Sequence, residues 1–242
     1  MTSDTVIWHD VECAAYDVDL ALWRELAESA GGPLLDIGAG TGRVALDLAA
    51  RGHDVTAIDS DADLIHELSA RARQRDLRVP ATAADARSFE LGRQYALAIA
   101  PMQVFQLLGG PDGRRSAMSC IRRHLHPGAV LAVALADPFE GIPDDQVMPP
   151  MPDIREIDGW VYASRPIAVR IDRPTAAIDR LRQSVSPTGE VNEWVFTLEI
   201  DLVTPADVEA EGADCGFVVR ERGWIPETDD WVGSNVVMLE AV

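Results

Sequence analysis

The sequence predicts an α/β fold in which a doubly wound, mostly parallel sheet carries an inserted antiparallel β segment. In the first half of the 242-residue chain, short apolar runs alternate with amphipathic segments, which is typical of parallel strands joined by helices. A glycine-rich turn connects the first apolar run to its helix. After Pro138 the runs become longer, and their apolar and polar residues partly alternate, as in antiparallel strands.

Apolar runs mark the strands of the predicted parallel sheet, and several of them end in an acid. We expect strands over 34–37, 55–58, 79–84, 95–100 and 129–135. The amphipathic segments predict helices over 17–29, 44–51, 60–72 and 116–124, with an N-terminal arm or short helix over 1–16. Because the carboxyl ends of parallel strands share one edge of a sheet, Asp36, Asp59 and Asp85 are expected to gather there.

The second half of the chain begins with a proline-rich connection that ends near residue 152. It continues with β runs over 159–171, 178–185 and 194–202, a helix over 205–213, and strands over 217–219 and 235–241. We therefore predict three parts. They are a core of residues 1–137 that includes the N-terminal arm, an inserted antiparallel region of residues 138–203, and residues 204–242, which complete the core sheet.

The composition indicates an acidic globular protein. Hydrophobic residues make up 47% of the chain, enough for a core, and the formal net charge is −19 at pH 7. A phosphate backbone requires a basic surface, so we expect no nucleic-acid partner. Three widely spaced cysteines match no metal-binding pattern, and no apolar run is long enough to span a bilayer. With no secretory pattern after Met1, we expect a cytoplasmic protein with reduced thiols, no metal and no membrane contact.

The stretch 34–43, LLDIGAGTGR, gives the strongest functional signal. Its glycines allow positive φ and let a ligand approach the backbone, and the following helix directs its free N–H groups at the turn. A dinucleotide site would have glycine in place of Arg43, and the acid Asp36 disfavours a pyrophosphate beside the turn. No Gly-Lys-Ser/Thr sequence follows, which excludes a P-loop. The stretch therefore indicates a site for a nucleotide-type or adenosyl-type ligand, and Asp36 suits a ligand that is cationic or offers an ammonium group.

The pattern Asp-x-Gly-x-Gly-x-Gly after the first strand resembles motif I of the class I S-adenosylmethionine-dependent methyltransferases. The resemblance covers most of the chain, with acids after strands two and three, a turn over 125–128 before strand five, and Thr204-Pro205 near the C-terminus. It is closest to the small-molecule branch, in which an antiparallel lid after strand five covers the acceptor site. It implies a Rossmann-like sheet of seven strands with the last one antiparallel, S-adenosylmethionine as cofactor and S-adenosylhomocysteine as product.

The resemblance also implies which residues bind the cofactor. They are Asp36, Gly38, Ala39, Gly40, Asp59, Ser60, Asp85, Ala86 and Ala100. The glycine turn would run beside the methionine and ribose parts of the cofactor, with Asp36 near its ammonium end. The two oxygens of Asp59 suit two ribose hydroxyls, and Asp85 would accept a hydrogen bond from the adenine amine. Alternatively, these acids only cap helices or face solvent.

The acceptor site is less specified than the cofactor site. The expected substrate-binding residues are Met102, Phe105, Phe139, Tyr162, Arg182 and Trp194. Gln103 and Tyr16 are the candidate catalytic residues, the first to hydrogen-bond the acceptor and the second to close over the cofactor. The aromatic residues could instead only pack in the lid or core. The chain shows no obvious general base, and residues 101–103 differ from the Asn/Asp-Pro-Pro-aromatic motif of enzymes that methylate nucleic-acid amines.

These features predict a methyltransferase that acts on N or O of a small organic molecule, as a monomer or homodimer. Methyl transfer from a sulfonium is an in-line displacement, which mainly requires alignment and the exclusion of water. A base is needed only if the acceptor is protonated. Two alternatives stay open: a protein that keeps the fold and the ligand without transfer, and an enzyme that uses the sulfonium for non-methyl chemistry such as a rearrangement.

Overall fold

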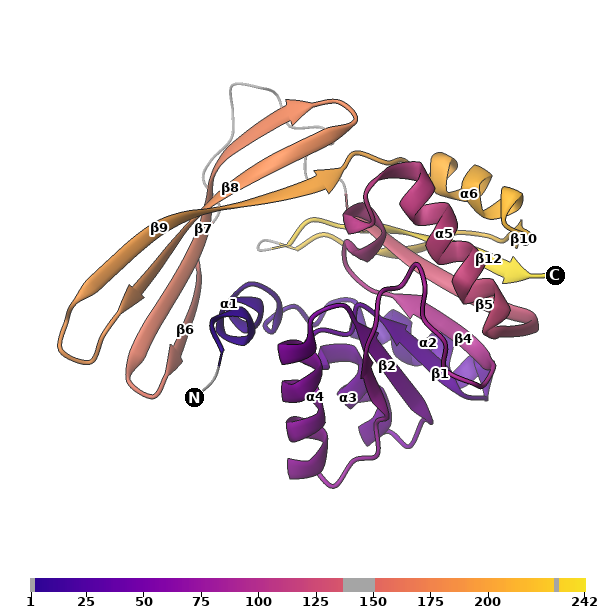
Figure 1. The fold of residues 1–242 in the computed structure, drawn as a ribbon, viewed down its shortest axis with the longest axis horizontal. Helices are drawn as coiled ribbons and strands as arrows, with labels where there is room; N and C mark the ends of the chain where they lie inside the picture. Colours follow the sequence, from indigo (N-terminus) through magenta and orange to yellow (C-terminus); the bar gives the residue numbers. More distant parts are fainter. Residues whose placement is uncertain (1–2, 137–150, 229–230) are drawn as a thin grey trace.

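A mixed sheet flanked by helices forms the core of the computed structural model, which describes residues 3–136, 151–228 and 231–242 (Figure 1). The strand order is β10 (Phe217–Val219), β12 (Ser234–Ala241), β5 (Leu125–Ala136), β4 (Tyr95–Ala100), β1 (Leu34–Ile37), β2 (Val55–Asp59) and β3 (Ala81–Ala83), and β11 (Gly223–Ile225) also pairs with β12. Strands β1 to β5 are parallel, and β12 is antiparallel to β5 and β10. The predicted α/β fold with a mostly parallel seven-stranded sheet is confirmed, and β11 is a short addition to it.

Helices cover both faces of this sheet. They are α2 (Leu20–Ala30), α3 (Arg43–Ala50), α4 (Ala62–Gln74), α5 (Gly110–Arg123) and α6 (Pro205–Asp214), with a 3₁₀ turn η1 (Val104–Leu107) after β4. The first helix, α1 (Asp4–Cys13), instead packs against α4 and the antiparallel strands after β5. Side chains alternate between the faces along each strand, so Leu34 packs with α2, α3 and α4, whereas Leu35 packs with α5 and α6. The same alternation at Leu131 and Ala132 places successive residues of β5 in the two cores on opposite faces and fixes the register of the sheet.

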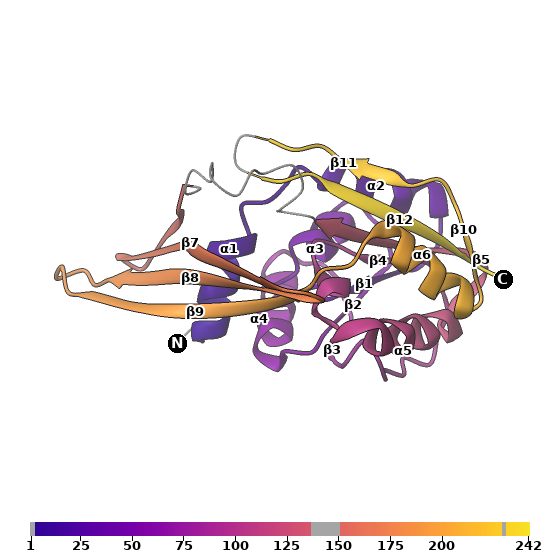
Figure 2. The same ribbon diagram turned by 90° about the horizontal axis from the view of Figure 1, so that it is seen from above.

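A second, antiparallel sheet follows β5 in the chain and extends away from the core (Figures 1 and 2). This lid sheet consists of β6 (Asp153–Ile157), β7 (Trp160–Asp172), β8 (Thr175–Val185) and β9 (Val191–Asp201), paired in that order. Three of its strands correspond to the predicted β runs, whereas no element was predicted at the position of β6. Asp158 and Gly159, with φ of 51° and 79°, form the tight turn between β6 and β7. An Asp-Gly pair between alternating runs is a known hairpin signal, so β6 could have been inferred.

Several element boundaries differ from those expected. The third strand is only Ala81–Ala83, and α2 begins at Leu20 instead of residue 17. The predicted turn 125–128 lies inside β5, because that strand starts at Leu125 and then shifts register against β4. Proline and glycine within a strand are typical of such an irregularity. The expected N-terminal arm is the helix α1, which begins at Asp4. Ser3 caps it, because its side chain accepts a hydrogen bond from the N–H of Val6.

The lid sheet is tied to the core where β9 ends. The buried guanidinium of Arg114 on α5 donates to Asp201 at 2.9 Å and to both oxygens of Glu211 on α6 at 2.8 Å. The buried amide of Gln106 bonds both backbone groups of Ala136 at 3.0 and 3.1 Å, and its Nε2 also reaches the carbonyl of Asp201 at 3.4 Å. The ends of β5 and β9 are therefore held together by one buried polar network.

This network makes Arg114 a test of how the lid is anchored. We expect Arg114→Ala to lower the free energy of unfolding by about 3 kcal/mol or more, because it leaves two carboxylates buried without their partner. Urea unfolding of the purified variant measures this. The matched control is Arg115→Ala, whose side chain is 43% exposed and whose ion pairs are 3.8–4.0 Å long. Equal stability of the two variants would contradict the proposed anchor.

Candidate functional site

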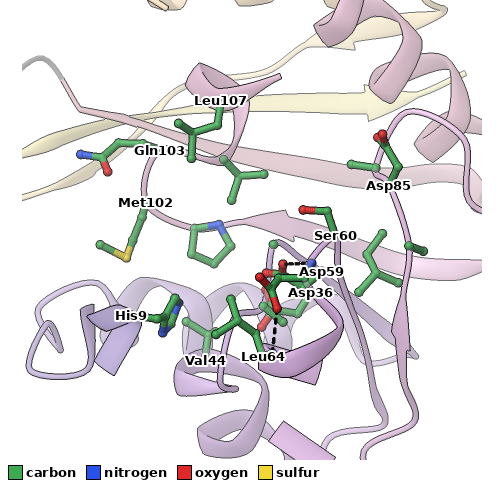
Figure 3. Close-up of a pocket in the computed structure, with 18 of the residues that line it drawn as sticks. His9, Asp36, Val44, Asp59, Ser60, Leu64, Asp85, Met102, Gln103 and Leu107 are labelled. Atoms are coloured by element: carbon green, nitrogen blue, oxygen red, sulfur yellow. Dashed lines mark hydrogen bonds between the residues drawn. The ribbon is translucent and has the colours of Figure 1, made fainter. Parts of the chain in front are cut away.

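A cavity of about 420 Å³ lies at the carboxyl edge of the parallel strands, where the sequence placed its acids. Its walls come from the glycine turn after β1, the ends of β2 and β4, the loop after β3, and helix α1. Figure 3 shows Asp36 and Asp59 together near the centre, with His9 toward one end and Asp85 toward the other. This volume is in the range of small-molecule sites.

The glycine turn forms the floor of the cavity and leaves no room for side chains. Gly38 and Gly40 have φ of 68° and 57°, in the left-handed region. A Cβ on Gly38 would lie 2.4 Å from the side chain of Val104, and one on Gly40 would lie 2.2 Å from Nε2 of His9. Gly38 and Ala39 line the cavity, whereas Gly40 is covered by the ring of His9.

Asp36 is a buried carboxylate whose side chain lacks a hydrogen-bond partner among the described residues. Its side chain lines the cavity and is 1% exposed. Burial raises the pKa of Asp36 to about 7, an effect that Arg43 opposes and Asp59 reinforces. Buried polar atoms are normally paired, so both oxygens of this carboxylate are free to accept hydrogen bonds inside the cavity.

Asp59 is the opposite case, since both of its oxygens already accept hydrogen bonds. Oδ2 accepts from the N–H of Gly40 and Oδ1 from the N–H of Asp61, both at 2.9 Å. The carboxylate thus connects the end of β2 to the glycine turn. Each oxygen has a further lone pair, and Asp59 and Ser60 both line the cavity, so these groups are available to a ligand with hydroxyls.

Asp85 closes the far end of the cavity as half of an ion pair. Nε and Nη2 of Arg87 donate to its two oxygens at 2.9 and 2.6 Å, and these hydrogen bonds lower the pKa of Asp85. Both side chains are partly exposed, at 38% for Asp85 and 49% for Arg87. Ala86 lines the cavity between them. The predicted adenine contact at Asp85 would therefore have to share the carboxylate with Arg87.

The opposite end of the cavity is made by residues after β4 and by α1. Met102, which has a φ of 57°, and Gln103 both line it, together with Leu107 and His9. Ala100 is fully buried at the end of β4, one residue before the lining residue Pro101. Phe105 is fully buried in the core beneath η1 and does not line the cavity.

Tyr16 also lies outside the cavity lining. Its ring packs against Trp231 with 5.1 Å between centroids, and the guanidinium of Arg43 lies 5.0 Å from the Tyr16 ring. Arg43 in turn donates to the Tyr16 carbonyl and to the buried Asp19. Burial raises the pKa of Tyr16 to about 12, so the phenol remains protonated.

Three predicted lid residues contact α1 instead of the cavity. Trp8 makes edge-on ring contacts with Tyr162 and Trp194, at centroid distances of 5.6 and 5.1 Å. Arg182 lies over the ring of Trp8 and donates to both oxygens of Glu12 at 2.9 Å. The remaining candidate, Phe139, lies outside the described residues.

His9, Cys13 and Arg43 line the cavity but were not among the expected site residues. Arg43 follows the glycine turn directly, so its position in the sequence could have predicted that it lines the cavity. His9 and Cys13 reach the cavity only because α1 docks over that turn. No local sequence pattern predicts this docking. In the part of the chain that the structure describes, no group of acidic, cysteine or histidine side chains could hold a metal, and no helix could span a membrane.

Comparisons with known proteins support the same site. Residues 34–128 match a family model described as a methyltransferase domain, a range that includes the glycine turn, Asp59 and Asp85. Among curated proteins, none matches this chain.

Solved structures resemble the fold along nearly its full length. A sugar N-methyltransferase from a Streptoalloteichus species is 17% identical, with a TM-score of 0.76 over 100% of this chain and 94% of that one. An amino pentose methyltransferase from Micromonospora echinaspora, solved with S-adenosylmethionine, is 19% identical, with a TM-score of 0.73 over 96% and 94%. An S-adenosylmethionine-dependent methyltransferase from Clostridium acetobutylicum is 12% identical, with a TM-score of 0.73 over 97% and 96%.

The family match falls on the glycine turn and the acids after β2 and β3, and the strand order and the sheet after β5 agree with the resemblance seen in the sequence. That resemblance and the cofactor that it implied are thereby confirmed, and the chain carries a class I S-adenosylmethionine-dependent methyltransferase domain.

Proposed function

We propose that this methyltransferase modifies a nitrogen of a small organic amine, with a hydroxyl oxygen as the second candidate acceptor. Two of the similar structures are, by their descriptions, a sugar N-methyltransferase and an amino pentose methyltransferase. Their low identity supports only the same fold, so the amine acceptor is our inference. As parts of this proposal, residues 1–137 and 204–242 form the cofactor-binding core, and residues 138–203 bound the acceptor side. We further propose a cytoplasmic protein without nucleic-acid partners.

The orphaned carboxylate of Asp36 is the observation that carries the proposal. The cavity holds a buried acid that lacks any partner within the described residues. S-adenosylmethionine has two cationic groups, an ammonium and a sulfonium, and either would compensate this charge. A phosphate-rich nucleotide would instead place negative charge beside Asp36 and Asp59.

The other cavity residues fit the remaining parts of such a cofactor. When bound, S-adenosylmethionine supplies a methyl group activated by a positively charged sulfur. Asp59 offers two carboxylate oxygens to the ribose hydroxyls, and Ser60 lies next to it. The loop at Asp85 and Ala86 would border the adenine. Met102 and Leu107 present apolar surface that excludes water, and Gln103 can hydrogen-bond the acceptor.

We infer that the lid sheet acts on the acceptor side through α1. Tyr162, Trp194 and Arg182 hold Trp8 and Glu12, and α1 brings His9 to the cavity wall. The lid aromatics would then fix the shape of the acceptor site without touching the acceptor. An in-line transfer depends on alignment, so a displaced α1 would slow transfer even when the cofactor binds.

The first test is cofactor binding at Asp59. We expect Asp59→Asn to weaken binding of S-adenosylhomocysteine by at least about tenfold, because a charge-assisted hydrogen bond to ribose contributes about 1.5–3 kcal/mol. Isothermal titration calorimetry measures the change. The control is Asp63→Asn, an exposed acid in the first turn of α4 that does not line the cavity. If the unmodified protein bound neither S-adenosylmethionine nor its product, the proposed function would be wrong.

The second test concerns the charge of Asp36. Because burial raises its pKa to about 7, the carboxyl binds a proton below that pH and cannot attract a cation. We expect binding of S-adenosylhomocysteine to strengthen as the pH rises to about 7 and to level off above it. In Asp36→Asn the binding should be weaker and independent of pH over this range. Titration calorimetry at a series of pH values measures both.

The same variant should have the opposite effect on stability without ligand. A folded-state pKa above the usual 3.8 means that the unfolded chain releases the proton first, so stability falls as the pH rises from about 4 through about 7. Asp36→Asn removes this loss, and we expect its Tm at about pH 8 to be a few degrees higher than that of the unmodified protein. A destabilised variant would contradict the assignment of Asp36 as a strained ligand-binding group.

A further inference from the structure

We propose that His9 faces the methyl-accepting atom and takes its proton, an inference that rests on the proposed transfer to nitrogen. His9 lies on α1 and lines the cavity at the end formed by Met102 and Gln103 (Figure 3). It contributes the only imidazole among the described cavity residues, and its side chain is 24% exposed. The ring is therefore accessible from the cavity and yet held by the protein.

The contacts of the ring favour one tautomer. Nδ1 lies 3.5 Å from Oγ1 of Thr41 and 3.9 Å from Oδ1 of Asp10. The Thr41 hydroxyl donates to Asp10 at 2.8 Å, so its oxygen is free to accept from an N–H at Nδ1. With the hydrogen on Nδ1, Nε2 carries the lone pair and lies against Gly40, whose Cβ would be 2.2 Å away if it had one. The basic nitrogen is thus on the side of the glycine turn.

Helix α1 is held firmly enough to position this ring. The buried carboxylate of Asp10 accepts from Arg71 on α4 at 3.1 and 2.5 Å and pairs with Arg155 on β6 at 3.6 Å. Trp8 is 4% exposed under the lid aromatics. The helix is therefore connected to the glycine turn, to α4 and to the lid sheet.

Other groups near His9 are poorly suited to accept a proton. The charged and titratable groups around it are Asp10, Arg71 and Arg155 on its Nδ1 side, and Asp36, Arg43 and Cys13 along the cavity. Burial raises the pKa of Cys13 to about 12, so it remains a thiol. Hydrogen bonds with His9, Arg71 and Thr41 outweigh burial and lower the pKa of Asp10. The Gln103 amide does not accept a proton at ordinary pH. Imidazole is the side chain that exchanges protons near neutrality.

The chemistry balances with one proton moved to His9. An amine acceptor reacts through its free lone pair, which forms the bond to the methyl carbon while the carbon–sulfur bond breaks and its electron pair stays on sulfur. The nitrogen gains a substituent and must lose one proton to return to a neutral amine. Nε2 of His9 takes this proton and later releases it to solvent.

Sinefungin tests the placement of His9 without any acceptor. This cofactor analogue carries an ammonium group near the position of the transferable methyl group, whereas S-adenosylhomocysteine has no group there. A neutral His9 would accept a hydrogen bond from that ammonium, and a protonated His9 would repel it. The effect of Asp36 on the ammonium that both ligands share cancels in the ratio of their dissociation constants. Any effect of Asp36 on the second ammonium of sinefungin would persist in a His9 variant.

We expect the preference for sinefungin over S-adenosylhomocysteine to increase about fivefold or more from about pH 5.5 to about pH 8.5, as measured by titration calorimetry. The variant His9→Gln should bind both ligands, with a preference that stays constant over this range. The control His66→Gln, at an exposed position of α4, should behave like the unmodified protein. Circular dichroism and Tm establish that the variants are folded, and His9→Asn provides a second variant.

Two results would overturn the proposal. If the pH-dependent preference persisted in His9→Gln, another group would face the ammonium. If His9→Gln weakened both ligands equally, His9 would bind a part of the cofactor that they share. Failure of both ligands to bind the unmodified protein is a different result, because it would overturn the proposed function itself and the role of His9 with it.

Discussion

The unpaired carboxylate of Asp36 is the constraint on which the site depends. It sits at the end of β1 between Leu35 and Ile37, which are fully buried, and such a group costs free energy when it is ionised. Burial moves its pKa to about 7, so below that pH the ligand-free protein holds the group mostly neutral. The buried charge lowers the stability of the ligand-free protein. A cationic ligand would remove this cost when it binds, and the relief would add to its affinity. Asp59, with two backbone N–H donors, instead serves as a fixed acceptor.

Helix α1 connects this site to the rest of the molecule. A few of its residues face different neighbours. Trp8 and Glu12 contact the lid sheet, Asp10 contacts Thr41 and Arg71, and His9 faces the cavity. A change in the lid can therefore reach the cavity through a single rigid element. In this arrangement the lid aromatics position α1 and do not need to contact an acceptor directly.

Local patterns were sufficient to predict the sheet, the glycine turn and the acids at its carboxyl edge, since each depends on neighbours in the chain. The Asp-Gly turn before β7 was a local signal that could have revealed β6. The docking of α1 had no such signal. It depends on ion pairs such as Glu12 with Arg182, which are 170 residues apart, and on aromatic contacts with Trp8. The periodicity of a sequence carries no information about long-range pairs of this kind.

The two ends of the cavity differ in a way that bears on the acceptor. At the end near Asp85, an exposed ion pair with Arg87 leaves the surface polar and accessible to water. At the other end, the lining residues Met102, Gln103 and Leu107 have apolar or neutral side chains. An ammonium ion that entered there would lose hydration without gaining a counter-charge, so the neutral amine is favoured. At that end, a group that accepts the proton from the methylated amine helps the reaction more than a further charged group would. Helix α1 places His9 in this position.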